Sequence, residues 1–328
     1  MIINKICGVL LLVLFVQLSC KQKISQKLTE QIDGPSKTYA EISIKEGGRW
    51  EGRKYVGENI TFKNVDFLRA PDSLTDHSYY IRYEGPGWES NKVGYRLYLD
   101  WRNAIDIFGK KVDTMVLSQV GRDNYDSYHE NAPWGQDILK AGKSLGIGSY
   151  GRYDGTTTHH FQKVDSTTVA ISNDSNASSV LVNYYGWKTD NVATDLSANL
   201  SIAPDSRMTK ATLQTSEAIE GLVTGMVKFE EITLMKSDDD SGGWAYIATY
   251  GEQTLVPDKL GMALFYRKKD VEKMVDGEFD HLLQFKPTTE PISYYFLGAW
   301  EQEKNGITNR QQFKDYLETL LTDFNRQS

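Results

Sequence analysis

Regular alternation of side chains is the feature that most restricts the fold of this chain. Residues 195–202 alternate between apolar and polar types, and residues 244–250 repeat with the same period of two. Successive side chains of a β-strand point to opposite faces, so both segments predict half-buried antiparallel strands. Residues 260–266 and 293–300 are more continuously apolar and predict central strands. The sequence therefore predicts a mainly β protein.

The aromatic content supports this fold class. The chain has 19 Tyr and 7 Trp but only 8 Pro among its 328 residues, and its 27 Gly can supply turns. Aromatic residues are enriched in strands. A hydrophobic fraction of 40% over this length is enough for a large core. We expect one continuous domain over residues 39–328, because no linker or repeat period interrupts it; a second small domain is the alternative.

Two segments predict helices. Near the end of the chain, apolar residues recur at the spacing of an amphipathic helix: Phe313, Tyr316, Leu317, Leu320, Leu321 and Phe324. Thr308 followed by Gln311 resembles a capping box, and the apolar face is expected to lie against a sheet. A shorter helix is expected to begin near Pro133, which suits a first helical turn. It would place Asp137 and Lys140 one helical turn apart.

The first residues predict export. An apolar run over residues 6–16 follows Lys5 and is too short to span a membrane, so residues 1–19 are interpreted as a signal peptide. Ser19 before Cys20 resembles a bacterial lipobox, although Gln17 stands where Leu is usual. We expect Cys20 to carry a lipid that anchors the protein to a membrane, with residues 20–38 as a polar tether. The predicted location is the periplasm or the outer membrane; cleavage to a soluble form is the alternative.

Charge and cysteine content exclude several classes of site. Cys7 lies in the signal peptide and Cys20 at its edge, so the folded body has no cysteine for disulfides, thiolate nucleophiles or metal binding. The formal net charge of −7 argues against nucleic acid as a partner. No cofactor is predicted. A metal site built from residues distant in the sequence stays open.

Residues 75–106 combine strand-forming and chemically active residues. They predict two strands joined by a Gly/Pro loop, with Val93, Tyr95, Leu97 and Leu99 directed into the core. The opposite face is polar: Tyr80, Arg82 and Glu84 in the first strand, and Arg96, Tyr98 and Asp100 in the second. Cations, carboxylates and aromatic rings on one face suit an acidic, polyhydroxylated ligand such as a sugar acid.

Two histidines are candidate acid/base groups. His129 lies among acids and next to Tyr128, just before the predicted short helix, and histidine is the side chain that titrates near neutral pH. The alternative for His129 is a hydrogen-bonded residue of a surface loop. His77 precedes the first predicted strand and can reach the same cleft, or it is held by Asp76 without a functional role.

The best candidates for binding a carboxylate or sulfate are Arg82 and Arg96, because a guanidinium forms two parallel hydrogen bonds with such groups. The alternative is a pair of internal salt bridges, Arg82 with Glu84 and Arg96 with Asp100. Two indole rings, Trp88 and Trp134, can stack on a sugar ring. Ordinary packing is the alternative for both.

Several longer segments carry a resemblance to a known family. They are residues 76–90 (DHSYYIRYEGPGWES), 98–103 (YLDWRN), 127–130 (SYHE), 134–140 (WGQDILK) and 299–303 (AWEQE). With these segments the chain resembles a family of exported bacterial proteins, long catalogued only as a domain of unknown function, that accompany polysaccharide-degrading enzymes. The resemblance covers nearly the whole mature chain.

The resemblance implies a catalytic β-sandwich of the galactose-mutarotase-like type (a supersandwich), with a site on a concave sheet face. It also implies a branch associated with ulvan breakdown, in which a dehydratase removes water from the uronic acid at the non-reducing end of an acidic oligosaccharide. The product would carry a 4,5-unsaturated uronyl end, which other polysaccharide-degrading enzymes would process.

Dehydration at C4 and C5 of a uronate requires a base, an acid and neutralisation of the carboxylate. We assign neutralisation to Arg82 or Arg96, and one proton transfer to His129. The opposite proton transfer falls to a tyrosine: Tyr80, Tyr98 or Tyr128. Secondary candidates are Asp137 and Lys140. Two alternatives stay open: a protein that only binds oligosaccharides, and a mutarotase- or epimerase-like enzyme, because fold alone does not decide activity.

Overall fold

The computed structural model describes residues 36–123, 127–238 and 242–326, and Lys37–Ser328 forms one compact unit. The predicted signal peptide, Cys20 and most of the predicted tether lie outside the described residues. Within the described ranges, no helix combines the length and the apolar character that crossing a membrane requires.

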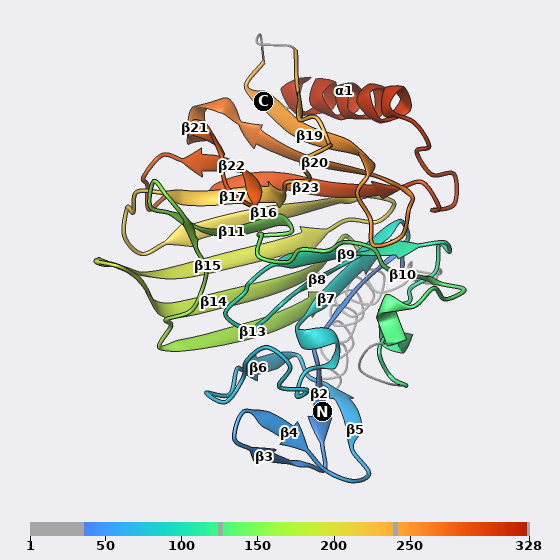
Figure 1. Ribbon diagram of the computed structural model, residues 1–328, viewed down its shortest axis with the longest axis vertical. Helices are drawn as coiled ribbons and strands as arrows, with labels where there is room; N and C mark the ends of the chain where they lie inside the picture. Colours follow the sequence, from blue (N-terminus) through green and yellow to red (C-terminus); the bar gives the residue numbers. More distant parts are fainter. Residues whose placement is uncertain (1–35, 124–126, 239–241, 327–328) are drawn as a thin grey trace, which may run out of the picture. The chain divides into compact units, whose positions relative to one another are not determined.

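The largest element is an antiparallel sheet of nine strands (Figure 1). In spatial order these are β18 (Met235–Lys236), β19 (Trp244–Glu252), β20 (Lys259–Arg267), β23 (Ile292–Trp300), β16 (Met208–Thr215), β15 (Val192–Ile202), β14 (Ser178–Thr189), β13 (Ser166–Asn173) and β6 (Phe67–Arg69). The predicted central strands at residues 260–266 and 293–300 are β20 and β23, paired with each other in the interior of this sheet.

Two five-stranded sheets pack against one face of the large sheet. The first has the order β1 (Thr38–Glu41), β7 (Gly87–Ser90), β8 (Val93–Leu97), β9 (Ile105–Lys110) and β10 (Gly135–Asp137). The second has the order β12 (Thr158–His159), β11 (Ile147–Tyr153), β17 (Leu222–Val227), β22 (Asp280–Phe285) and β21 (Val271–Asp276). A parallel bridge between Ile105 and Gly146 links the two.

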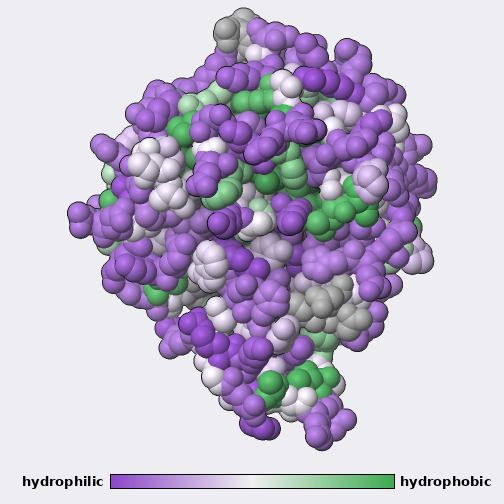
Figure 2. Space-filling view, viewed as in Figure 1, coloured by the Kyte–Doolittle hydropathy of each residue, from purple (hydrophilic) through white to green (hydrophobic). Residues whose placement is uncertain are grey.

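Shorter elements complete the fold. Two small hairpins pair β2 (Ser43–Glu46) with β5 (Thr61–Asn64), and β3 (Arg49–Glu51) with β4 (Lys54–Val56). Four short 3-10 helices occur in connections: η1 (Arg82–Glu84), η2 (Leu117–Gln119), η3 (Ser127–His129) and η4 (Lys268–Asp270). The face of the molecule seen in Figure 2 is mostly hydrophilic, with a few apolar patches.

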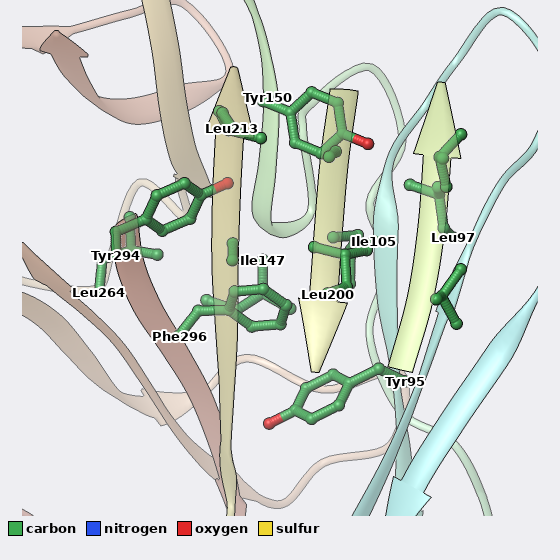
Figure 3. Close-up of a cluster of buried hydrophobic side chains, with 14 of the residues drawn as sticks. Tyr95, Leu97, Ile105, Ile147, Tyr150, Leu200, Leu213, Leu264, Tyr294 and Phe296 are labelled. Atoms are coloured by element: carbon green, nitrogen blue, oxygen red, sulfur yellow. The ribbon is translucent and has the colours of Figure 1, made fainter. Parts of the chain in front are cut away.

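The core lies between the large sheet and the two smaller ones. Figure 3 shows side chains from all three sheets meeting there: Leu200, Leu213, Leu264, Tyr294 and Phe296 from the large sheet, Tyr95, Leu97 and Ile105 from the first small sheet, and Ile147 and Tyr150 from the second. These side chains are fully buried. The predicted fold class, a mainly β sandwich with a C-terminal helix, is confirmed.

The period-two pattern at residues 195–202 is confirmed in β15, where Leu196, Ala198, Leu200 and Ile202 are buried. The segment 244–250 is also a strand, β19, but its expected half-exposure is wrong. Both of its faces are buried, because the helix α1 (Arg310–Arg326) packs on the outer face of β19 and β20 (Figure 1).

Helix α1 follows its predicted apolar stripe, with Phe313, Leu317 and Leu321 buried against the sheet. Its start differs by one residue from the prediction. Asn309, rather than Thr308, caps the helix, since its Oδ1 accepts a hydrogen bond from the Gln312 N–H at 2.9 Å. The Gln312 Oε1 in turn accepts from the Thr308 N–H at 3.0 Å, one residue before the N–H that a capping box uses.

The predicted first strand of the polar hairpin is wrong. The chain forms η1 there, with Tyr79, Tyr83 and Glu84 in the left-handed region, so Tyr80, Arg82 and Glu84 do not share a strand face. Strand pairing begins only at Gly87 and turns back after Ser90.

The second predicted strand is confirmed only as far as Leu97, where β8 ends, so Tyr98 and Asp100 do not share a strand face with Arg96. Strand β8 buries Val93, Tyr95 and Leu97 in the core and leaves Arg96 on the other face.

The predicted helix near Pro133 is also wrong. Residues Gly135–Asp137 form β10, which pairs with β9. Gly135 has φ 134° and approaches the Gly109 carbonyl so closely that a Cβ would lie 1.8 Å from its oxygen. Strand pairing therefore overrides the local helix signal, and Asp137 and Lys140 are not one helical turn apart. Asp137 is buried whereas Lys140 is exposed.

We predict that Phe313→Ala lowers the free energy of unfolding by about 3–5 kcal/mol, the usual cost of deleting a buried aromatic ring. The Phe313 ring rests on Gly261 of β20, so its loss leaves a cavity under α1. Denaturant unfolding measures the effect. Gln311→Ala, on the exposed side of the same helix, is the control, with an expected change below about 0.5 kcal/mol; equal effects of both variants would contradict the packing of α1.

Candidate active site

The outer face of the first small sheet carries charged residues instead of apolar ones. While Trp88, Tyr95 and Ile107 of this sheet point into the core, the opposite face holds Glu89, Arg96, Asp106, Lys110 and Asp137, all buried. Buried charges occur in proteins almost only when they are paired. The partners come from neighbouring strands and from the loop that connects β9 to β10.

Two ion pairs fasten that loop to the sheet. Glu89 pairs with Lys110 at 2.5 Å and also accepts hydrogen bonds from the Val116 and Leu117 N–H groups, each at 2.8 Å. Arg82 pairs with Glu41 and donates to the carbonyl oxygens of residues 117 and 120 at 3.1 and 3.0 Å. The Arg82 side chain is completely buried. The expectation that Arg82 binds substrate is corrected: its guanidinium is an internal anchor for the loop.

Arg96 is the centre of a second cluster. Its Nη2 lies 2.8 Å from Asp137 Oδ2, 2.9 Å from Asp106 Oδ2 and 2.5 Å from Tyr98 Oη. The guanidinium carbon also lies 4.4 Å from the centroid of the Tyr98 ring and 4.8 Å from that of Tyr128. The Arg96 side chain is completely buried, so the expectation of an open carboxylate anchor is corrected. Its main carboxylate partners are Asp106 and Asp137, not Asp100 as the alternative had it.

Two carboxylates therefore share one guanidinium nitrogen. Burial and the neighbouring Asp137 carboxylate raise the pKa of Asp106 to about 7, although Arg96 acts in the opposite direction. The Asp106 Oδ1 is buried and has no hydrogen-bond partner among the described residues. Such a pair of carboxyls retains one proton more easily than two separate ones, so Asp106 can hold or release a proton near neutral pH.

The cluster reaches the surface through His129 and Tyr98. The His129 Nδ1 lies 3.1 Å from Asp137 Oδ2, and 40% of the His129 side chain is exposed. The Tyr98 hydroxyl donates to Asp106 Oδ2 at 2.8 Å. Burial raises the pKa of Tyr98 well above its usual value even though Arg96 opposes this, so the phenol is protonated at neutral pH.

A series of three contacts connects Tyr98 with His129. Tyr98 Oη lies 2.5 Å from Arg96 Nη2, the same nitrogen lies 2.8 Å from Asp137 Oδ2, and that oxygen lies 3.1 Å from His129 Nδ1. An imidazole fixed through Nδ1 by a buried carboxylate can exchange a proton through Nε2. A protonated phenol near a guanidinium can donate one. The arrangement therefore combines a candidate proton acceptor, His129, with a candidate proton donor, Tyr98, in one hydrogen-bonded cluster.

Two aromatic side chains, Tyr128 and Trp134, pack near the Arg96 cluster. Tyr128 is buried, and its ring lies 4.3 Å from that of His129, measured between centroids. Trp134 is partly buried and contacts the edge of Phe108, with ring centroids 6.0 Å apart. Burial raises the pKa of Tyr128, so the Tyr128 phenol next to the His129 ring stays protonated at neutral pH.

Arg102 forms one rim of the site and was not among the predicted site residues. Its guanidinium carbon lies 4.1 Å above the Tyr98 ring, and Arg102 pairs with Asp100, Glu84 and Asp76. The sequence offered one signal, the position of Arg102 in the family segment 98–103.

His77 also lies at this rim, because its Nδ1 is 2.5 Å from Asp76 Oδ1. Ligand atoms of Asp76, His77 and Glu84 lie within 4.8 Å of one another, close enough to hold a metal ion. Arg102 already neutralises Asp76 and Glu84, however, and a metal ion would compete with it.

Tyr80 and Trp88, two aromatic residues predicted to bind substrate, lie outside the Arg96 cluster. Tyr80 packs against Trp50 and Tyr55 of the β3–β4 hairpin, at centroid distances of 5.1 and 5.0 Å. Trp88 is fully buried in the core, and its Nε1 donates to the Thr209 hydroxyl at 2.8 Å. The expected stacking of Trp88 on a sugar is therefore wrong, and its alternative, ordinary packing, is confirmed. Tyr80 does not join the Arg96 cluster.

We predict that Arg82→Ala lowers the free energy of unfolding by about 3–5 kcal/mol, because it leaves the Glu41 carboxylate buried without its partner. The double variant Arg82→Met with Glu41→Leu should recover most of that loss. Denaturant unfolding of the three proteins checks this. A stable Arg82→Ala variant that only binds ligand more weakly would restore the substrate-binding role.

We predict a pH-dependent difference in stability between the protein and its Asp106→Asn variant. An unfolded chain releases the Asp106 proton near pH 4, whereas the folded protein keeps it to about pH 7. The native protein should therefore lose stability relative to the variant as pH rises from about 4 to 7, by at most about 1.4 kcal/mol per pH unit, and the difference should be constant above pH 7. Unfolding curves at several pH values measure it; a difference independent of pH would contradict the raised pKa.

Comparisons with known proteins place the chain in a family. No curated protein matches it. A family model described as "Domain of unknown function (DUF4861)" matches residues 11–327, nearly the full length of the chain. This agrees with the resemblance seen in the sequence, and the protein belongs to the family of the domain of unknown function DUF4861.

Proposed function

We propose that the protein is a carbon–oxygen lyase, an oligosaccharide dehydratase that removes water from a uronic acid at the non-reducing end of an acidic, ulvan-type oligosaccharide. The observation that carries this proposal is the pairing of His129 and Tyr98 across the Arg96 cluster. One side chain is oriented by a buried carboxylate, and the other is a protonated phenol beside a guanidinium.

The two side chains divide the reaction between them. His129 Nε2 would take the proton from C5 of the uronate, and the C5–H electron pair would form the C4–C5 double bond. The C4–O bond breaks, and the leaving hydroxyl takes the Tyr98 proton and departs as water. Arg96 is in contact with the Tyr98 Oη and would stabilise the phenolate, since fixed charges aimed at developing charge are usually the largest catalytic contribution. Asp106, which accepts from Tyr98, can return a proton to it.

Neutralisation of the substrate carboxylate falls to Arg102 in this geometry, in place of Arg82 or Arg96. Arg102 is the guanidinium of the cluster that reaches the surface, with 17% of its side chain exposed. Of its three acidic partners, Asp76 is the most exposed, at 38%, against 11% for Glu84 and 3% for Asp100. A substrate carboxylate would therefore displace Asp76 and take its place on Arg102.

The proposed location follows the sequence: an exported protein of the periplasm or the outer membrane, anchored by a lipid on Cys20. Such a location would bring it together with polysaccharide-degrading enzymes that accept its unsaturated product.

The proposal is tested by incubating the protein with uronate-terminated oligosaccharides and following the ultraviolet absorbance of the unsaturated uronyl end, together with the loss of one water in the mass spectrum. We expect His129→Ala and Tyr98→Phe each to lower kcat by about 10²- to 10⁴-fold, the usual share of general acid–base catalysis, with little change in folding. Arg102→Ala should mainly raise KM.

His159→Ala is the matched control, because His159 is another partly exposed histidine paired with an aspartate, Asp154. It should keep full activity. Binding of the oligosaccharides without absorbance or mass change would favour the oligosaccharide-binding protein instead, and exchange of the C5 proton without water loss would favour the epimerase-like enzyme.

A further inference from the structure

A cleft of about 250 Å³ is lined by Arg102, the residue whose guanidinium lies over the Tyr98 ring of the Arg96 cluster. It is formed by the turn after β8, the β11–β12 hairpin and the turn between β21 and β22. Its walls include Trp101, Arg102, Lys143, Tyr153, His160 and Phe279. This volume is close to the lower end for small-molecule pockets in proteins, about 300 Å³, and so fits a ligand of the size of a sugar ring.

The walls of this cleft have the chemistry of a sugar site. Trp101 is 44% exposed, which is unusual for so large an apolar side chain, and an exposed aromatic face can stack on a pyranose ring. Residues 156–158, all threonines, and Ser144 also line the cleft. Lys143 lies 5.4 Å above the Phe279 ring and adds a positive charge.

The acidic side chains that line this cleft repel an anionic ligand less than their number suggests, because one of the two is buried. Glu278 and Asp280 line it, but Asp280 is buried and accepts a hydrogen bond from the Leu145 N–H, and burial raises its pKa to about 7. His160 donates through Nδ1 to the Arg102 carbonyl oxygen at 2.6 Å. Among the other charged groups that line the cleft, Glu278 is an exposed acid and Arg102 is already paired with three acids, so Lys143 is the cation that an anionic ligand would meet.

Arg102 connects this cleft with the candidate active site. Its guanidinium lies above the Tyr98 ring, and the same residue lines the cleft together with its neighbour Trp101. Arg102 therefore contacts Tyr98 of the candidate site and also lines the cleft next to Trp101.

Another cleft, of about 320 Å³, is also lined by Trp101. It is lined by three acids, Asp72, Asp100 and Asp165, and by one further cation, Arg53. Its charge suits an anionic sugar less well than that of the cleft at Lys143.

We propose that the cleft at Trp101 and Lys143 is the subsite for the sugar that follows the terminal uronate in an acidic oligosaccharide. Trp101 stacks on this sugar, and Lys143 pairs with its carboxylate or sulfate. This proposal rests on the proposed lyase function for its choice of ligand, and it makes the protein selective for chains over single sugars.

Substrates of different length test the subsite. A uronate methyl glycoside has no second sugar, whereas di- and trisaccharides ending in the same uronate fill the cleft. We expect Trp101→Ala and Lys143→Ala to raise KM for the di- and trisaccharides about tenfold with kcat nearly unchanged, and to leave KM for the methyl glycoside unchanged. Trp101→Phe should recover most of the loss. Tyr185→Ala, which removes another exposed aromatic side chain (43% exposed), is the control and should change neither constant.

The result separates the subsite from the lyase function. If the variants change KM equally for the methyl glycoside and the longer chains, or for none of them, the subsite is wrong although the lyase stands. If no substrate is converted, calorimetric titration with the same three ligands decides: a loss of affinity in Trp101→Ala that is confined to the longer chains supports the subsite in a binding protein, and equal affinity of variant and parent overturns it.

Discussion

The buried guanidinium of Arg96 is the interaction on which the candidate site depends. A charge with no exposure to water is stable only if its partners are close and well oriented, and Arg96 has two carboxylates, a phenol and two aromatic rings around it. Tyr98 and His129 take their positions from the same partners, because Tyr98 bonds to Asp106 and His129 to Asp137. The positions of Tyr98 and His129 are therefore fixed by a buried ion cluster.

The sheet beneath the cluster explains how such a charged layer can be tolerated. Arg96 and Asp106 are cross-strand partners in β8 and β9, and Asp137 belongs to β10, the next strand. Hydrogen bonding between these strands fixes the three side chains relative to one another, while their neighbours Tyr95 and Ile107 are held in the core on the other face. The β9–β10 loop is held to this charged layer by hydrogen bonds between its backbone and the side chains of Glu89 and Arg82. A site on rigid strands keeps its geometry better than one on loops alone.

The sequence predicted the elements whose pattern is local and missed those decided by distant contacts. The alternation of β15 and the apolar stripe of α1 each arise from one buried face, so both could be read from spacing. Spacing alone could not show that the helix expected near Pro133 is wrong. This segment is a strand because it pairs with β9, and that pairing brings Gly135 close to Gly109. The same limit applies to the site. His129, Tyr98, Arg96 and Asp137 were proposed from residue type alone. The contacts of Arg96 and Tyr98 with Asp106 and the position of Arg102 depend on strand register and on the left-handed turn at η1.

The balance of charge decides how an acidic ligand can approach such a site. Asp76, Glu84, Asp100, Asp106 and Asp137 outnumber Arg96 and Arg102 when all are ionised. Protonation of Asp106 leaves Arg96 with Asp137 at 2.8 Å and Glu84 at 3.9 Å as its charged partners, and the field at the surface is then set by Arg102 and its partners. Because Asp76 is the most exposed of those partners, it is also the one that a ligand can displace at the lowest cost in desolvation. A uronate that displaces Asp76 replaces one carboxylate on Arg102 with another. The total charge next to Arg102 is then unchanged, so an acidic ligand can bind although the site contains many acids.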